Sequence, residues 1–128
     1  MVRIVAPMVK VNLRGKEELR VYPHFAMAPY FAVIDLLPDG SKKVEVIPNP
    51  YSGGPARSGG GRGRMVQGLV LSLRPDILIA TGIGPGAFYS LQSLGIRLYR
   101  SKSKDIDGIV EEYRQGRLQP LTQPTDQL

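Results

Sequence analysis

The sequence predicts a single mixed α/β domain in which helices cover a sheet of parallel and antiparallel strands. Two apolar runs, 30–37 and 43–47, flank a Pro-Asp-Gly turn at 38–40, which is the pattern of an antiparallel hairpin. Helical and strand-like patterns then alternate over 65–116, as in a right-handed crossover between parallel strands. A chain of 128 residues suits one such core and is too short for a two-domain enzyme.

The N-terminal half is predicted to supply the antiparallel strands. Residues 2–6 form a nearly continuous apolar run, which predicts a buried strand that Pro7 ends. Residues 8–21 alternate apolar and charged positions, which indicates a hairpin or an extended loop. The run 43–47 carries Lys43 and Glu45 and is therefore expected at a sheet edge, where charged side chains discourage pairing with other chains.

The C-terminal half is predicted to supply the helices and the parallel strands. Apolar residues at helical spacing predict three helices, and short apolar runs predict two strands between them. The helices are expected at 65–73, 85–94 and 103–116, and the strands at 77–80 and 96–99. We expect Ser103 to cap the last helix. The domain is thus predicted to span 1–116, followed by a disordered tail at 117–128.

The composition restricts the function classes. The chain has no cysteine and only one histidine, which excludes disulfides, zinc fingers and an iron–sulfur site built on thiolates. A net charge of +6 favours anionic partners such as nucleic acid, phosphates and anionic metal clusters. No apolar run approaches the ~20 residues that span a bilayer, so we expect a cytoplasmic protein that does not bind membranes.

A glycine-rich loop follows the apolar run at 77–80. Gly82, Gly84 and Gly86 precede or begin a helix whose first residue is predicted to be Pro85, so backbone N–H groups and the positive end of the helix dipole meet there. Such a loop binds anions, or it simply packs a helix onto a sheet. A dinucleotide site is less favoured, because no residues remain for the second half of that fold.

A second glycine-rich stretch occupies 48–64 and is predicted to be a long mobile loop. It is not a phosphate-binding loop, because glycines stand where that motif needs Lys followed by Ser or Thr. Arg57, Arg62 and Arg64 could instead close over an anion, since arginine offers a planar fork of donors. A solvated loop is the alternative.

His24 and Met27 are candidate metal ligands in the segment before the strand at 30–37. A lone histidine is more often structural than ligating. A thioether three residues away suits soft or cluster metals, and Met8 is a candidate further neighbour.

No catalytic constellation is apparent. The acidic residues on or beside the predicted strands lie on different elements, which does not suit two-metal nuclease chemistry. These residues are Asp35, Glu45, Asp76 and Asp105. With one histidine there is also no nucleophilic triad to propose, so we expect a protein that is not an enzyme.

Three segments together carry a family resemblance. They are His-Phe-Ala-Met-Ala-Pro-Tyr-Phe at 24–31, Gly-Ile-Gly-Pro-Gly-Ala-Phe at 82–88 and Leu-Gly-Ile-Arg-Leu-Tyr at 94–99. In these segments, and over roughly 1–116, the chain resembles the dinitrogenase iron–molybdenum cofactor biosynthesis family. That family includes nitrogenase cofactor carrier proteins and a domain of the cofactor-maturation radical enzyme.

The resemblance implies a ribonuclease H-like, three-layer α/β/α sandwich with about five strands and three helices, without nuclease activity. It also implies a role in binding or carrying an iron–sulfur or iron–molybdenum cluster, or its precursor, with His24 as the first candidate ligand. Partners would then be the proteins that donate or accept the cluster, and the oligomeric state stays open.

Two alternatives remain at this stage. One is a nucleic-acid-binding module that uses the basic loop together with Arg97 and Arg100. The other is a domain that binds a nucleotide or phosphate at the 82–86 loop.

Overall fold

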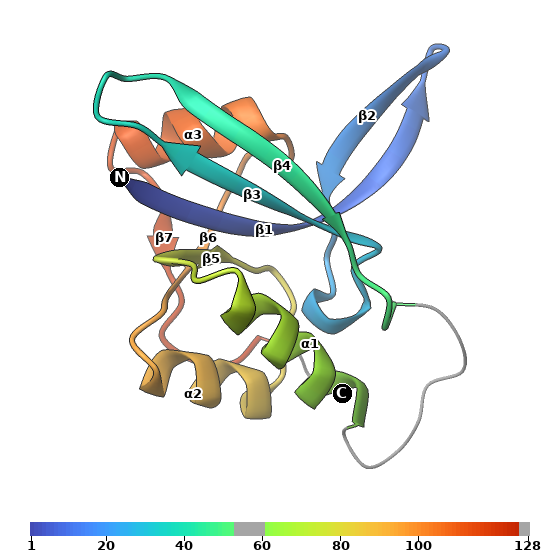
Figure 1. The fold of residues 1–128 in the computed structure, drawn as a ribbon, viewed down its shortest axis with the longest axis vertical. Helices are drawn as coiled ribbons and strands as arrows, with labels where there is room; N and C mark the ends of the chain where they lie inside the picture. The colour runs from blue at the N-terminus through green and yellow to red at the C-terminus, as the bar shows by residue number, and fades with distance from the viewer. Residues whose placement is uncertain (53–60, 126–128) are drawn as a thin grey trace.

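The computed structural model describes residues 1–52 and 61–125, which form one mixed sheet with helices on both faces (Figure 1). The sheet contains β1 (Val2–Leu13), β2 (Lys16–Val21), β3 (Tyr30–Leu36), β4 (Lys42–Pro48), β5 (Ile77–Ile79), β6 (Arg97–Arg100) and β7 (Gln119–Pro120). The helices are the short 3₁₀ turn η1 (Phe25–Met27), α1 (Gly61–Ser72), α2 (Pro85–Ser93) and α3 (Ile106–Arg114). The predicted α/β sandwich is confirmed, with a seven-stranded sheet where about five strands were expected.

The strands lie in the order β4-β3-β1-β5-β6-β7, and β2 pairs with the far half of β1. β1, β3 and β4 are antiparallel neighbours, whereas β1, β5 and β6 run parallel. The carboxyl ends of β5 and β6 therefore lie at the same end of the sheet. β4 forms one border, as predicted from its charged residues.

β1 continues through Pro7, where the sequence predicts that the strand ends. The carbonyl of Pro7 accepts a hydrogen bond of 2.9 Å from the N–H of Tyr22. The two backbone polar groups of a strand residue face the same neighbour, so the nitrogen of Pro7 also faces this side. There β1 pairs with β5 only at Ile4 and Val5 and with β2 from Met8 onward. Pro7 thus lies where the pairing with β5 has ended, and it joins the β1–β2 ladder through its carbonyl alone, because proline has no N–H to donate in return.

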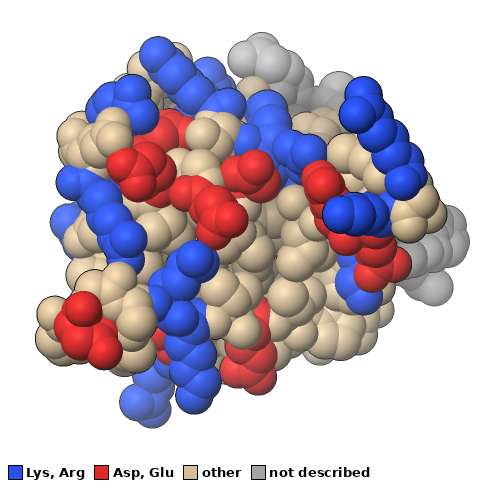
Figure 2. All heavy atoms as spheres, turned by 90° about the horizontal axis from the view of Figure 1, so that it is seen from above, with Lys and Arg blue, Asp and Glu red and all other residues tan. Residues whose placement is uncertain are grey.

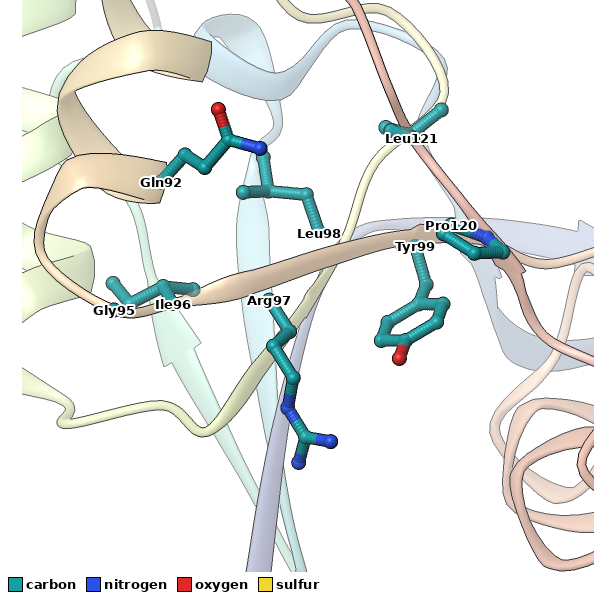
Figure 3. A pocket seen from close by; sticks show the side chains of 8 residues that line it. All are labelled: Gln92, Gly95, Ile96, Arg97, Leu98, Tyr99, Pro120 and Leu121. Carbon is teal, nitrogen blue, oxygen red and sulfur yellow. The ribbon is translucent and has the colours of Figure 1, made fainter.

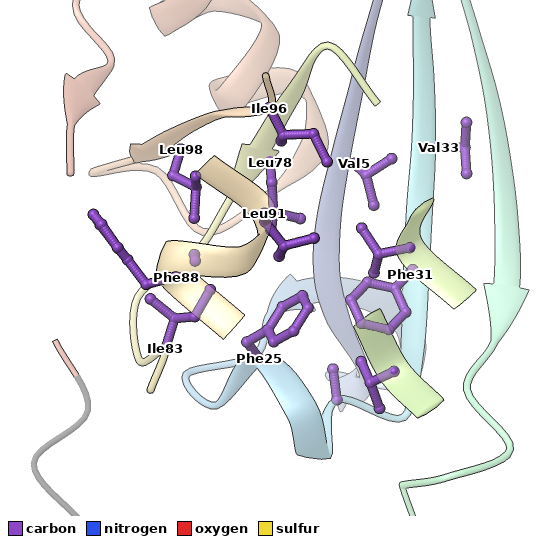
Figure 4. Packing of buried hydrophobic residues seen from close by; sticks show 14 residues of the cluster. Val5, Phe25, Phe31, Val33, Leu78, Ile83, Phe88, Leu91, Ile96 and Leu98 are labelled. Atoms are coloured by element: carbon purple, nitrogen blue, oxygen red, sulfur yellow. The ribbon is translucent and has the colours of Figure 1, made fainter. Parts of the chain in front are cut away.

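Alternation along the strands divides the apolar residues between two clusters, one on each face of the sheet. The first cluster joins odd-numbered residues of β1 and β3, such as Val5 and Phe31, to η1, α1 and α2 (Figure 4). The second joins the even-numbered residues, such as Ile4 and Ile34, to α3. The three layers are therefore α1 with α2, the sheet, and α3, as Figure 1 shows with α3 on the opposite side from the other two helices.

α1 and α2 pack on the sheet through part of the apolar faces that the sequence predicts. Val66 and Phe88 are fully buried, and burial of a side chain of this size contributes about 2 kcal/mol. Met65 and Leu94, which belong to the predicted apolar faces, are instead 55% and 58% exposed. α1 also begins at Gly61, four residues before the predicted start, so it reaches into the glycine-rich stretch.

α3 is capped by Asp105 and not by Ser103. The carboxylate of Asp105 accepts a hydrogen bond of 2.8 Å from the N–H of Gly108. The N–H of Ser103 donates instead to the carboxylate of Glu112, at 2.7 Å. The helix ends before Gly116, whose positive φ of 69° is the left-handed conformation that glycine favours.

Residues 117–125 differ from the predicted disordered tail. β7 pairs antiparallel with β6, and the N–H of Leu121 donates to the carbonyl of Leu98 at 2.9 Å. Leu121 also packs against the first apolar cluster. Short strands at a sheet border are difficult to predict because their stability comes from the partner strand rather than from their own sequence.

A search of the described residues for a helix long and apolar enough to cross a membrane finds none.

Candidate functional site

Backbone hydrogen bonds join the two segments that the sequence singles out. The N–H of Gly82 donates to the carbonyl of Pro23 at 2.7 Å, and the N–H of Phe25 donates to the carbonyl of Gly82 at 2.9 Å. His24 and Gly82 thereby form a parallel bridge at the carboxyl end of β5. Phe25 is buried beside Phe31, with ring centroids 5.8 Å apart, and so anchors the histidine segment in the core.

Gly82 is required by this close approach. A Cβ atom at this position would lie 2.5 Å from the carbonyl oxygen of Pro23 and 3.4 Å from Nδ1 of His24. The first distance is shorter than any real contact of this type, and backbone cannot move aside as a flexible side chain can. At Gly84 and Gly86 a Cβ would meet nothing within 4 Å. Of the three candidate glycines, Gly82 is therefore structural, while the other two border open space.

The N-terminus of α2 is open in the described structure. Gly84 is its N-cap, without a side-chain hydrogen bond, and Pro85 begins the helix. Within the described residues, no hydrogen bond uses the N–H groups of Gly84, Gly86 or Ala87, whereas Phe88 donates to the carbonyl of Gly84 at 3.0 Å. Unused donors at the positive end of a helix dipole favour an anion.

His24 and Met27 lie at the surface, and Met8 does not accompany them. The imidazole of His24 is exposed and contacts the ring of Tyr22 edge-on, with centroids 6.3 Å apart. Met27 ends η1 and is 43% exposed. Met8, considered as a neighbour, is fully buried in the cluster beneath α3.

The candidate arginines are only partly described. Arg57 lies outside the described residues, and Arg62 belongs to α1 with its side chain outside them. Arg64 is exposed on α1, which packs against both η1 and α2. The structure therefore brings the helix that carries Arg64 against the two elements that carry Met27 and Gly86.

Asn49 is a positioning residue that the sequence analysis did not single out. Its side chain is buried, its Nδ2 donates to the carbonyl of Ala28 at 2.8 Å, and its Oδ1 accepts from the N–H of Tyr51 at 3.1 Å. These bonds connect the segment that carries Met27 to the end of β4. The signal was available, because an asparagine between Pro48 and Pro50 is typical of a turn that its own side chain stabilises.

Thr125 fastens the glycine loop from the C-terminal side. Its hydroxyl donates to the carbonyl of Thr81 and accepts from the N–H of Ile83 at 3.2 Å, and its own N–H donates to the carbonyl of Ile83 at 3.1 Å. Nothing in the local sequence predicts this contact. The loop is thus held by two segments, 23–25 and 125, that are distant from it in the chain.

The carboxylates do not converge on a metal site. In the part of the chain that the structure describes, no three His, Cys, Asp or Glu side chains lie close enough together to hold a metal ion. Asp35 forms an ion pair with Arg3, in which Nε of Arg3 lies 2.7 Å from Oδ1 of Asp35. This hydrogen bond holds the pKa of Asp35 below its ordinary value. Asp76 accepts the N–H of Arg3 at 2.8 Å. One imidazole and one thioether do not fit a resident metal ion with three or four protein ligands.

The basic residues of β6 do not form one surface. Leu98 and Tyr99 pack on opposite faces of the sheet, so Arg97 and Arg100, three residues apart, also project to opposite faces. Arg97 lines a cavity of about 330 Å³ beside β6, and Arg100 does not (Figure 3). On the face seen in Figure 2, Lys and Arg side chains alternate with Asp and Glu rather than forming a continuous basic patch. Ion pairs also join side chains of opposite charge, as between Lys42 and Asp107, 3.1 Å apart.

Comparison with known families assigns the chain. The family model described as dinitrogenase iron-molybdenum cofactor matches residues 8–116, from the middle of β1 to the end of α3. The chain belongs to this family. Among curated proteins, an uncharacterised protein of Methanocaldococcus jannaschii is 28% identical over 101 residues, which cover 78% of this chain and 81% of that protein.

Solved structures share the fold of this member of the dinitrogenase iron-molybdenum cofactor family. A candidate NifB protein from Thermotoga is 28% identical, with a TM-score of 0.72 and coverage of 100% of both chains. The apo form of the orange protein from Desulfovibrio gigas is 22% identical, with a TM-score of 0.73 over 97% of this chain and 96% of that one. A candidate dinitrogenase from Methanocaldococcus jannaschii is 16% identical, with a TM-score of 0.68 over 95% and 96%.

Both candidate segments, 24–31 and 82–88, lie inside the region that the dinitrogenase iron-molybdenum cofactor family model covers, whereas Thr125 lies beyond it.

Proposed function

We propose that this protein is a non-enzymatic carrier that binds an anionic iron–sulfur or iron–molybdenum cluster, or a precursor of one, as its cargo. One observation carries the proposal: the bridge between His24 and Gly82 joins the segment with the chain's one imidazole to the loop that leads into α2, whose first N–H groups have no acceptor within the described residues. Membership of the dinitrogenase iron-molybdenum cofactor family supports the class of cargo.

Each proposed contact suits a different part of such a cargo. The imidazole of His24 is a ligand for iron, and the thioether of Met27 is a soft ligand suited to sulfur-rich metal centres. The N–H groups of Gly84 and Gly86 would donate to the anionic atoms at the cluster surface. Arg57, Arg62 and Arg64 would supply countercharge, in keeping with the net charge of +6.

A small number of protein ligands favours carriage over permanent storage. A resident cluster is commonly held by four cysteine thiolates, and this chain has no cysteine. A cargo bound through one imidazole, one thioether and hydrogen bonds can pass to an acceptor after few bonds are broken. The partners would therefore be proteins that assemble the cluster or receive it.

The first experiment is anaerobic reconstitution with iron, sulfide and molybdate, followed by metal analysis and an absorption spectrum. We expect the wild type to retain iron, with or without molybdenum, and His24→Ala to lose it. Met27→Ala should weaken retention, whereas Met65→Ala, which removes another exposed methionine from α1, should not. A wild type that retains no metal, or His24→Ala that retains as much as the wild type, contradicts the proposal.

A second experiment tests the backbone donors separately. Gly84 has φ −73° and ψ 166°, which a proline adopts without strain. Gly84→Pro removes one N–H from the helix start, while Gly84→Ala keeps it and adds a Cβ into open space. We expect Gly84→Pro to retain less metal than Gly84→Ala at equal thermal stability. Equal metal retention by the two variants would show that the N–H of Gly84 does not bind the cargo.

A further inference from the structure

The outer edge of β4 is unpaired in the described structure, where β4 borders the sheet (Figure 1). The N–H of Leu37 donates to the carbonyl of Ser41, and the N–H of Asn49 donates to the carbonyl of Pro29, both at 2.9 Å. Antiparallel strands alternate between hydrogen-bonded and non-hydrogen-bonded pairs. The odd-numbered residues of β4 therefore direct their backbone N–H and carbonyl groups toward β3.

The even-numbered residues of β4 consequently direct their backbone groups away from the sheet. Lys42, Val44 and Val46 each offer an N–H and a carbonyl, and Pro48 offers only a carbonyl. A second β4 strand can satisfy these groups if it runs antiparallel about a two-fold axis that passes through one residue of the strand.

The charges on β4 distinguish among the possible axes. An axis at Lys43 places two lysines opposite each other, and an axis at Glu45 places two glutamates opposite each other, both of which are unfavourable. An axis at Val46 pairs Val44 with Pro48, which has no N–H to donate. An axis at Val44 places Lys43 of each strand opposite Glu45 of the other, so that two pairs of opposite charge form.

The same axis also matches the apolar and hydrogen-bonding groups. Val44 lies opposite its own copy, and Lys42 lies opposite Val46, so every outward N–H finds a carbonyl. Val44 is 39% exposed in the single chain, and burying it against its copy removes apolar surface from water. Lys43 and Glu45 are both exposed, and within the described residues neither belongs to an ion pair.

We propose that two copies of this protein associate through antiparallel pairing of their β4 strands about a two-fold axis at Val44, specified by reciprocal pairs of Lys43 with Glu45. Charged edge strands normally prevent association with other proteins. Here the alternation of charge also makes the edge complementary to itself in one register. The surface involved is a single strand, so the dimer is weak.

The test is sedimentation equilibrium of the full chain from about 10 µM to about 1 mM, the range that brackets a weak interface. We expect the wild type to dimerise reversibly. Lys43→Glu and Glu45→Lys should each weaken self-association by about tenfold or more, because both reciprocal pairs become like-charged. Lys16→Glu, which makes the same change in net charge as Lys43→Glu but at the exposed end of β2, should dimerise like the wild type.

Mixing the two variants keeps the test independent of folding. An equimolar mixture of Lys43→Glu and Glu45→Lys restores opposite charges at both positions, so we expect a heterodimer about as stable as the wild-type dimer. The double variant K43E/E45K should form a homodimer for the same reason. A wild type that is monomeric at about 1 mM, or a dimer that the single variants do not weaken and that mixing does not restore, overturns the proposal.

Discussion

Two connections of this fold have the same form but differ in the groups that bond their backbone. One leads from β5 to α2 and the other from β6 to α3. Each follows a parallel strand and ends at a helix N-terminus. In the second, side chains of the chain itself accept the backbone donors: Asp105 caps α3, and Glu112 accepts from the N–H groups of Lys102, at 3.0 Å, and Ser103. In the first, the described residues hold the loop through backbone groups and a threonine hydroxyl, and within residues 1–52 and 61–125 the N–H donors at the start of α2 have no acceptor.

The backbone N–H groups of the α3 connection thus have side-chain acceptors from the chain itself. The α2 connection is fixed in its conformation, but N–H groups at its end have no acceptor within the described residues. Burial alone raises the pKa of Glu112, but the hydrogen bonds from Ser103, Lys102 and Ser101 outweigh this effect and lower the pKa to about 2. The α3 connection therefore contains a buried, permanently charged carboxylate at neutral pH. The α2 connection depends on close backbone contact, which does not titrate.

The largest expected effect is at Gly82. Gly82→Ala places a Cβ 2.5 Å from the carbonyl oxygen of Pro23, and we expect it to lower the free energy of unfolding by about 3 kcal/mol. Urea unfolding measures this, with Gly84→Ala as the matched control because its Cβ meets nothing within 4 Å. If both variants are equally stable, the close contact between the two segments does not hold the α2 connection together.

Glu112 should show a smaller, pH-dependent effect. Glu112→Gln should lower the free energy of unfolding by about 2 kcal/mol at pH 7, since a charged acceptor of several hydrogen bonds is lost. Because the folded pKa of about 2 lies below the ordinary 4.5, this stabilisation is complete above pH 4.5 and disappears as the pH falls towards 2.

Unfolding measured from pH 7 to pH 2 tests the Glu112 prediction. The wild type should lose more stability than Glu112→Gln over the acidic part of the range, so the two curves converge. Glu111→Gln, at the exposed neighbouring position, should follow the wild type. Parallel curves for wild type and Glu112→Gln would mean that this carboxylate does not stabilise the α3 connection.

The smallest expected effect is at Thr125. Thr125→Val removes the hydroxyl that joins Thr81 to Ile83, and we expect a loss of about 1 kcal/mol. Hydrogen exchange of the Ile83 amide should become about fivefold faster, because that N–H loses its acceptor. Thr122→Val, at an exposed position of the same segment, is the control. An unchanged exchange rate would indicate that residues 23–25 alone hold the α2 connection.

Local chemistry made several parts of the fold predictable. The turn at 38–40 needs a glycine, and Gly40 has a φ of 89°. Gly95 and Gly116, which the sequence places after two helices, also have positive φ values, 88° and 69°. The positions of β3, β4 and the three α-helices followed from apolar periodicity, because the period of a helix or strand is a property of the segment itself.

Features that depend on a distant partner were not predictable in the same way. α3 has Asp105 and not Ser103 as its cap, and the backbone N–H of Ser103 is held by the carboxylate of Glu112. β1 passes through Pro7 because the neighbouring strands leave a gap at that point. Residues 117–125, expected to be disordered, are ordered by β6 and by the loop that Thr125 contacts.

The sequence by itself determined the alternation of strands and helices, the turns, and the three segments that carry the family resemblance. Only the tertiary structure decided that His24 and Gly82 are neighbours, that Gly82 is structural while Gly84 and Gly86 face open space, and that Met8 is buried elsewhere. The physical reason is that periodicity and turn chemistry act over a few residues. Contact between segments depends instead on strand order and on which face of the sheet each side chain occupies.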